Sequence, residues 1–96
     1  MQIKLFGPSM TRANAKDLSS ALEHLERGDW RAAHEIVQRD EDSALACWAH
    51  GIVHLIEGDA SNARYWYRRA GRGFPASAEI EPELEAMRRA LDAPRE

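Results

Sequence analysis

The sequence predicts an all-α domain of about five helices, arranged as two helical hairpins followed by a C-terminal capping helix. The first observation is composition: the 96 residues include sixteen alanines but only eight valine, isoleucine and threonine residues in total. Alanine loses no side-chain rotamer freedom in a helix, whereas β-branched residues do. The second observation is that apolar residues recur every three to four positions. No substantial β-sheet is therefore expected.

A repeated Gly-Asp dipeptide is the third observation. The windows 21–39 and 51–69 lie thirty residues apart and are identical at six positions. These positions are His24/His54, Leu25/Leu55, Gly28/Gly58, Asp29/Asp59, Ala33/Ala63 and Arg39/Arg69. Glycine adopts the left-handed conformation that ends a helix, and aspartate accepts backbone N–H bonds at the start of the next one. We therefore predict two degenerate copies of one helix-turn-helix unit.

The first hairpin is predicted to follow an N-terminal arm over residues 1–10. Its first helix begins between residues 11 and 14 and ends at Arg27, with an apolar stripe that faces the core. Its second helix runs from Trp30 to about Arg39 and ends at the polar run 40–43. The acids and the serine of that run favour the N-terminus of a third helix through capping and the helix dipole.

The second hairpin is predicted from Ala44 to about Glu57 and from Ala60 to Gly71. At 100° per residue the first of these helices has two faces. One face is apolar and consists of Leu45, Trp48, Ala49, Ile52, Leu55 and Ile56. The opposite face consists of Cys47, His50, His54 and Glu57. The second of these helices is expected to turn Trp66 and Tyr67 inward, and Tyr65 and Arg69 outward.

A fifth helix is predicted over about 82–92. Pro82 suits its first turn, where the missing N–H is not needed. Apolar residues at helical spacing would let this helix cover the open end of the stack, as terminal repeats must. A single domain over 11–92 and a tail over 93–96 follow from this assignment.

The cysteine content and the lack of long apolar runs indicate where the protein is located. The net charge is −3, and Cys47 is the one cysteine. A single cysteine forms no internal disulfide, which fits a reducing compartment. Residues 1–6 are too short and too polar for a signal peptide, and no apolar run approaches the ~20 residues of a membrane span. We expect a cytoplasmic protein without a membrane segment.

The second hairpin resembles a tetratricopeptide repeat. The positions that carry the resemblance are Gly51, Gly58–Asp59, Ala63, Tyr67 and Ala70, with fewer matches in the first hairpin at Ala21, Gly28–Asp29 and Ala33. The offset of 30 residues departs from the usual 34, and the closing proline is missing. The resemblance implies a right-handed stack of α-hairpins that binds proteins along a concave surface. The segment 62–71 also resembles small uncharacterised bacterial proteins, which implies no activity.

A helix-lined groove is the first candidate site. In the repeat that the chain resembles, the first helix of each hairpin lines the concave surface. Here that surface would present His24, Cys47, His50, His54 and Glu57. We expect these residues to bind a protein partner or a second copy of the chain. No catalytic residue and no cofactor are expected, because nothing supplies a Gly-rich oxyanion turn beside Cys47.

An arginine cluster is the second candidate site. It consists of Arg64, Tyr65, Arg68, Arg69 and Arg72. Guanidinium groups bind phosphate and exposed rings stack on bases, so nucleic-acid or anionic-ligand binding is the alternative function. Only Tyr65 is expected to remain free for stacking, however, and the nearby acids could pair with the arginines. Those acids are Glu79, Glu81, Glu83 and Glu85. We expect an ion-paired surface here and no nucleic-acid partner.

A metal-dependent activity is the third interpretation. His50, His54 and Glu57 stand at i, i+4 and i+7, a spacing that brings two imidazoles and a carboxylate together. His34 or Cys47 could add a further ligand. The segment 34–38 lacks the second histidine of a zincin motif, and two-ligand motifs are weakly specific. We therefore expect no metal, and a polar surface instead.

Overall fold

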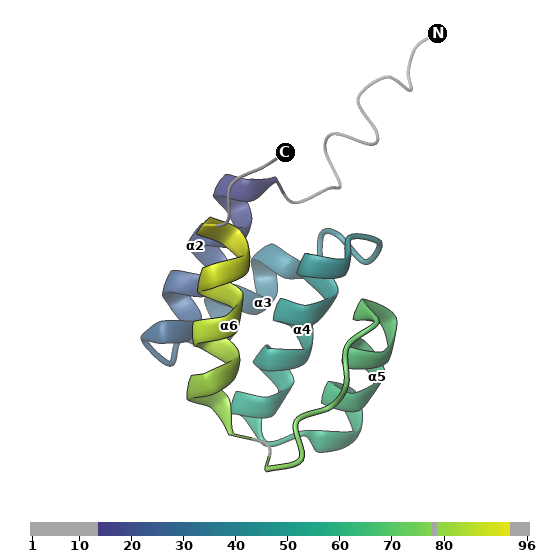
Figure 1. Cartoon of the computed structure of the whole chain (residues 1–96). Helices are drawn as coiled ribbons and strands as arrows, with labels where there is room; N and C mark the ends of the chain where they lie inside the picture. Colours follow the sequence, from purple (N-terminus) through teal and green to yellow (C-terminus); the bar gives the residue numbers. More distant parts are fainter. Residues whose placement is uncertain (1–13, 78, 93–96) are drawn as a thin grey trace, which may run out of the picture.

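The structure is a computed structural model that describes residues 14–77 and 79–92. These residues contain five helices joined by short connections (Figure 1). They are α2 (Ala15–Glu26), α3 (Trp30–Val37), α4 (Ala44–Glu57), α5 (Ala60–Ala70) and α6 (Ile80–Asp92). These residues contain no strand, so the predicted all-α class with about five helices is confirmed. The predicted arm 1–10, the domain start at 11–13 and the tail 93–96 lie outside the described residues.

The two Gly-Asp dipeptides form the two turns that the sequence predicts. Gly28 and Gly58 have positive φ angles of 80° and 90°, the left-handed conformation that glycine adopts without a Cβ clash. Asp29 and Asp59 are the N-caps of α3 and α5, and each carboxylate accepts the backbone N–H three residues further on. Each dipeptide therefore ends one helix and starts the next.

The loop between the hairpins is organised by a buried aspartate. The Oδ1 atom of Asp40 accepts the backbone N–H groups of Asp42 and Ser43, both at 3.0 Å. The hydroxyl of Ser43 in turn caps α4. These bonds hold a turn that is incompatible with helix, which explains why α3 ends at Val37 and not at the predicted Arg39.

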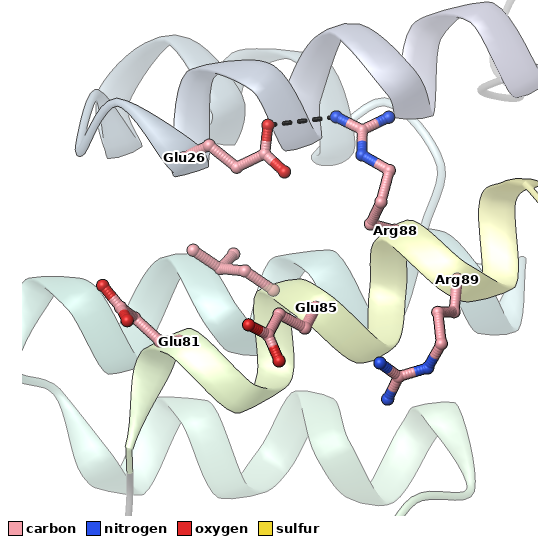
Figure 2. A pocket seen from close by; sticks show the side chains of 6 residues that line it. Glu26, Glu81, Glu85, Arg88 and Arg89 are labelled. Carbon is pink, nitrogen blue, oxygen red and sulfur yellow. Dashed lines mark hydrogen bonds and ion pairs between the residues drawn. The ribbon is translucent and has the colours of Figure 1, made fainter.

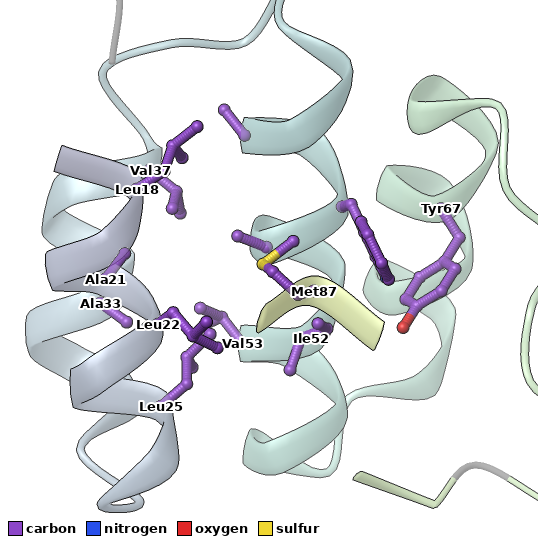
Figure 3. Close-up of a cluster of buried hydrophobic side chains, with 13 residues drawn as sticks. Leu18, Ala21, Leu22, Leu25, Ala33, Val37, Ile52, Val53, Tyr67 and Met87 are labelled. Atoms are coloured by element: carbon purple, nitrogen blue, oxygen red, sulfur yellow. The ribbon is translucent and has the colours of Figure 1, made fainter. Parts of the chain in front are cut away.

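Helix α4 is the centre of the fold. It packs on each of the other four helices. Helix α2 also packs on α3, and α6 packs on α2 as well as on α4. Figure 3 shows the apolar side chains that converge from these helices. The buried core consists of Leu18, Ala21, Leu22, Leu25, Ala33, Val37, Ala46, Trp48, Ala49, Ile52, Val53, Tyr67 and Met87. Removing such side chains from water is the main stabilising contribution.

The prediction that α4 has one open polar face is wrong. Every residue over 46–54 is buried, and this stretch includes Cys47, His50 and His54. The reason is that other elements cover these side chains: Trp66 of α5 stacks on His50, and His34 of α3 lies against His50 and His54. The thiol of Cys47 bonds to the backbone oxygen of Glu41. Glu57, in the last turn, does stay exposed.

No helix among the described residues is long and apolar enough to cross a membrane.

Candidate functional site

Three histidines from two helices meet beside α5. His34 comes from α3, and His50 and His54 lie one turn apart on α4. The Nε2 atoms of His34 and His50 are 3.2 Å apart. The ring centroids lie 4.9 Å apart for His34 and His50, 5.6 Å for His34 and His54, and 5.2 Å for His50 and His54. We call these three residues the histidine cluster.

Side chains on two sides fix the orientation of the histidine cluster. Trp66 of α5 stacks on His50 with ring centroids 3.8 Å apart and planes 7° apart. The guanidinium of Arg69 lies 5.5 Å from the centroid of the Trp66 ring. At the other end, Nδ1–H of His54 donates to Oε1 of Glu57 at 2.7 Å, which leaves Nε2 of His54 as the nitrogen with a lone pair.

The environment disfavours the charged forms of His34 and His50. Burial, followed by the charges that His34 and His54 would carry, lowers the pKa of His50 to about 3. Burial and His54 also lower the pKa of His34 below its ordinary value, although Glu57 and Glu35 oppose the shift. Because a charged imidazole at either position would be desolvated and would repel its neighbours, the neutral forms of His34 and His50 predominate at neutral pH.

Acid is expected to destabilise the protein through His50. Between pH 6.5 and 3 the unfolded His50 is protonated while the folded one is not, so the unfolded state binds one more proton. The free energy of unfolding should fall by about 1.4 kcal/mol for each pH unit in that range, in addition to the contribution of other groups. Urea denaturation of the chelator-treated protein at pH 7, 6 and 5 measures this, with His50→Gln as the control. Equal pH dependence in the two proteins would show that His50 titrates normally.

The predicted groove residues do not form one open surface. Cys47 and His50 are 1% and 4% exposed. His24 is half-buried in the last turn of α2, and its Nδ1 lies 3.7 Å from a carboxylate oxygen of Asp29 in the following Gly-Asp turn. The thiol of Cys47 donates to the backbone oxygen of Glu41, and burial raises its pKa, so the thiolate form is disfavoured. Cys47 is thus an interior side chain.

The arginine cluster is engaged with the protein's own aromatic rings. The guanidinium of Arg72 lies 3.4 Å from the centroid of Trp48, and that of Arg64 lies 4.7 Å from the centroid of Phe74. Arg69 donates to the backbone oxygen of Glu41 at 2.6 Å. Trp66 and Tyr67 are buried and Tyr65 is 46% exposed, as the sequence predicts.

The predicted pairing of these arginines with the acids of residues 79–85 is wrong. Within the described residues, none of those acids lies within ion-pair distance of an arginine in 64–72. The ion pair that α6 makes joins Arg88 to Glu26 of α2, at 3.0 Å. Helix α6 packs on α2 and α4, and its Glu83 accepts hydrogen bonds from Trp48 and Tyr67.

Glu83 has a role that the sequence reasoning missed. Its Oε1 atom accepts hydrogen bonds from Nε1–H of Trp48 at 3.0 Å and from the hydroxyl of Tyr67 at 2.5 Å. Burial and this carboxylate raise the pKa of Tyr67 far above its ordinary value. A signal was present, because a buried tryptophan and a buried tyrosine each need an acceptor.

An open groove runs between α2 and α6, and we call it the α2–α6 groove. Figure 2 shows the charged side chains along it, with Glu81 and Glu85 on the N-terminal half of α6 and Arg88 and Arg89 further along. Its half-buried apolar residues are Ile56, Ile80 and Leu84. The groove therefore combines charged side chains with a half-buried apolar part.

The fold and these sites define a small all-α domain with an internal histidine cluster and an open groove. No family model, no curated protein and no solved structure matches the chain. The resemblance to tetratricopeptide repeats therefore stays a prediction.

Proposed function

We propose that the chain is a non-catalytic interaction domain that binds a protein helix in the α2–α6 groove. The occupant that the charges favour is α6 of a second copy, antiparallel to the first. The observation that carries this proposal is the order of the charged residues of α6 that line the groove. The acids Glu81 and Glu85 come before the arginines Arg88 and Arg89. An antiparallel copy would bring acids opposite arginines at both ends of the contact.

The symmetry of such a pair repeats each favourable charge contact at both ends, and these two contacts offset the like charges of the two Glu85 side chains at the centre. In an antiparallel pair centred on Glu85, Glu81 of one copy lies opposite Arg89 of the other, and the reverse holds at the other end. Arg88 is already paired with Glu26 in its own chain, so Arg89 is the cation available to the partner. Exposed pairs of this kind contribute up to about 1 kcal/mol each, which sets orientation more than affinity.

The apolar part of the groove supplies the attraction. Ile56, Ile80 and Leu84 are half-buried, so a second helix would remove their remaining surface from water. A single small domain in a chain of 96 residues has a modest core, and association would add stability by mass action. The free, buried thiol of Cys47 supports a cytoplasmic location as part of this proposal.

A charge exchange tests the proposal. Sedimentation equilibrium should give a concentration-dependent dimer for the wild type. Glu81→Arg should weaken the dimer on the order of tenfold, because two symmetry-related pairs each lose about 0.5–1 kcal/mol. Arg89→Glu should do the same. The double variant Glu81→Arg/Arg89→Glu should recover most of the wild-type affinity.

Two results would contradict the proposal. One is a wild-type protein that is monomeric at every concentration. The other is a double variant whose loss of dimer affinity equals the sum of the losses in the two single variants. Glu35→Arg is the matched control, because Glu35 is an exposed acid on α3 outside the groove. This control should dimerise as the wild type does. Circular dichroism of each variant verifies that the helices are intact.

A further inference from the structure

The geometry points to a binding site for one divalent transition-metal ion of the zinc type, with His34, His50 and His54 as the three protein ligands. The site lies on the opposite side of α4 from the α2–α6 groove and does not depend on the function proposed above. Sequence spacing alone selected a different set, in which Glu57 was a ligand and His34 only a possible addition.

The distances between ring nitrogens in the histidine cluster suit three ligands of one metal ion. One nitrogen from each ring lies within 4.8 Å of the others. Two imidazole nitrogens bound tetrahedrally at 2.0–2.1 Å from zinc are about 3.3–3.4 Å apart. The 3.2 Å between Nε2 of His34 and Nε2 of His50 already matches that separation. Small side-chain rotations of His54 would close the third side of the triangle.

The hydrogen bonds of the cluster favour a ligand over simple packing. Two imidazole nitrogens in contact form at most one hydrogen bond, here between Nε2 of His34 and Nε2 of His50. The unpartnered Nδ1 of the buried His50 would carry the proton of the ring when Nε2 binds an ion. An ion between the rings would replace a weak contact by two coordinate bonds.

Glu57 acts as a positioning residue in this site. Its carboxylate accepts Nδ1–H of His54, so Nε2 of His54 carries the lone pair. A carboxylate behind a ligating histidine is the usual arrangement in metal sites, where it fixes the tautomer and increases the basicity of the ligand. A second grouping of His54, Glu57 and Asp59 is less suitable, because Asp59 already caps α5 and accepts from Asn62.

The surroundings fit an ion that enters from solvent. His34 is only partly buried, whereas His50 is covered by the Trp66 ring stacked on it. Three imidazole nitrogens match the ligand preference of zinc, and they leave a fourth position for water or another ligand. Cys47 is not part of the grouping, since its thiol is bonded to the Glu41 oxygen.

Calorimetric titration of untagged, chelator-treated protein with zinc chloride tests the site. We expect one zinc per chain, with micromolar or tighter affinity and a higher melting temperature. His34→Gln and His50→Gln should each abolish stoichiometric binding. Glu57→Ala should weaken it on the order of 10–100-fold, as loss of a supporting carboxylate does in other sites. Cobalt substitution should give the visible absorption of a tetrahedral site.

The fourth histidine supplies the matched control. His24 occupies the position in the first hairpin that corresponds to His54, but it lies beside Asp29 and outside the cluster. His24→Gln should bind zinc as the wild type does. No stoichiometric zinc binding by the folded wild type would overturn the assignment. So would binding that survives in both His34→Gln and His50→Gln, with melting temperatures that verify their folding.

Discussion

The variant Trp48→Ala is expected to lose about 3–5 kcal/mol of unfolding free energy, the range found when a large buried aromatic side chain is truncated. Trp48 is 1% exposed in the middle of α4. Its ring lies against the guanidinium of Arg72, and its Nε1–H donates to Glu83 of α6. Truncation therefore leaves a cavity and also removes a hydrogen bond that joins α4 to α6.

Urea denaturation followed by circular dichroism measures this loss. Trp30→Ala is the control, because Trp30 is only half-buried at the start of α3 and should cost much less. If Trp48→Ala does not fold, Trp48→Phe retains most of the volume and should fall between the wild type and the alanine variant. A Trp48→Ala protein as stable as Trp30→Ala would contradict the central position of α4.

The variant Gly51→Val is expected to lose about 3 kcal/mol, at the upper end of the usual range for overpacking. A Cβ atom at Gly51 would lie 2.5 Å from Cδ1 and 2.7 Å from Cε1 of Tyr67, and 3.4 Å from the backbone oxygen of Ala63. Tyr67 cannot move away freely, since its hydroxyl is bonded to Glu83. Glycine thus sets the close approach of α4 and α5.

A double-mutant cycle tests this contact. Gly51→Ala combined with Tyr67→Leu should cost less than the sum of the two single changes, because the smaller side chain leaves room for the new methyl group. Additive costs would mean that Gly51 and Tyr67 do not restrict each other. Ala60→Val, at an exposed position of α5, is the surface control and should change stability little.

The helices of the second hairpin could be predicted closely because their ends are determined locally. Ser43 caps α4, Gly58 ends it in the left-handed conformation, and the structure gives the predicted range of Ala44–Glu57. A cap and a stop act within a few residues, so the sequence alone contains the necessary information. The resemblance between the two Gly-Asp turns reflects the same local chemistry.

The burial of α4 could not be predicted in this way. A helical projection ranks faces by the polarity of one helix, but α4 is packed on by four others, and its histidine face is covered by α5. The contact between His34 and His50 joins residues sixteen positions apart, and the Trp48–Glu83 bond joins residues thirty-five apart. Such contacts depend on tertiary packing, which periodicity does not determine.

The most direct measurement of the central claim, that the α2–α6 groove holds a second copy, is an inter-copy distance at α6. A spin label on a cysteine introduced at Glu85, in a Cys47→Ser background, would sit at the centre of the antiparallel pair. Double electron–electron resonance should give a distance below about 25 Å, since packed helix axes are about 8–10 Å apart and each label adds its own length. The same label at Glu35 should give a longer distance. A longer distance at Glu85 than at Glu35, or no dipolar modulation at concentrations where a dimer forms, would contradict the account.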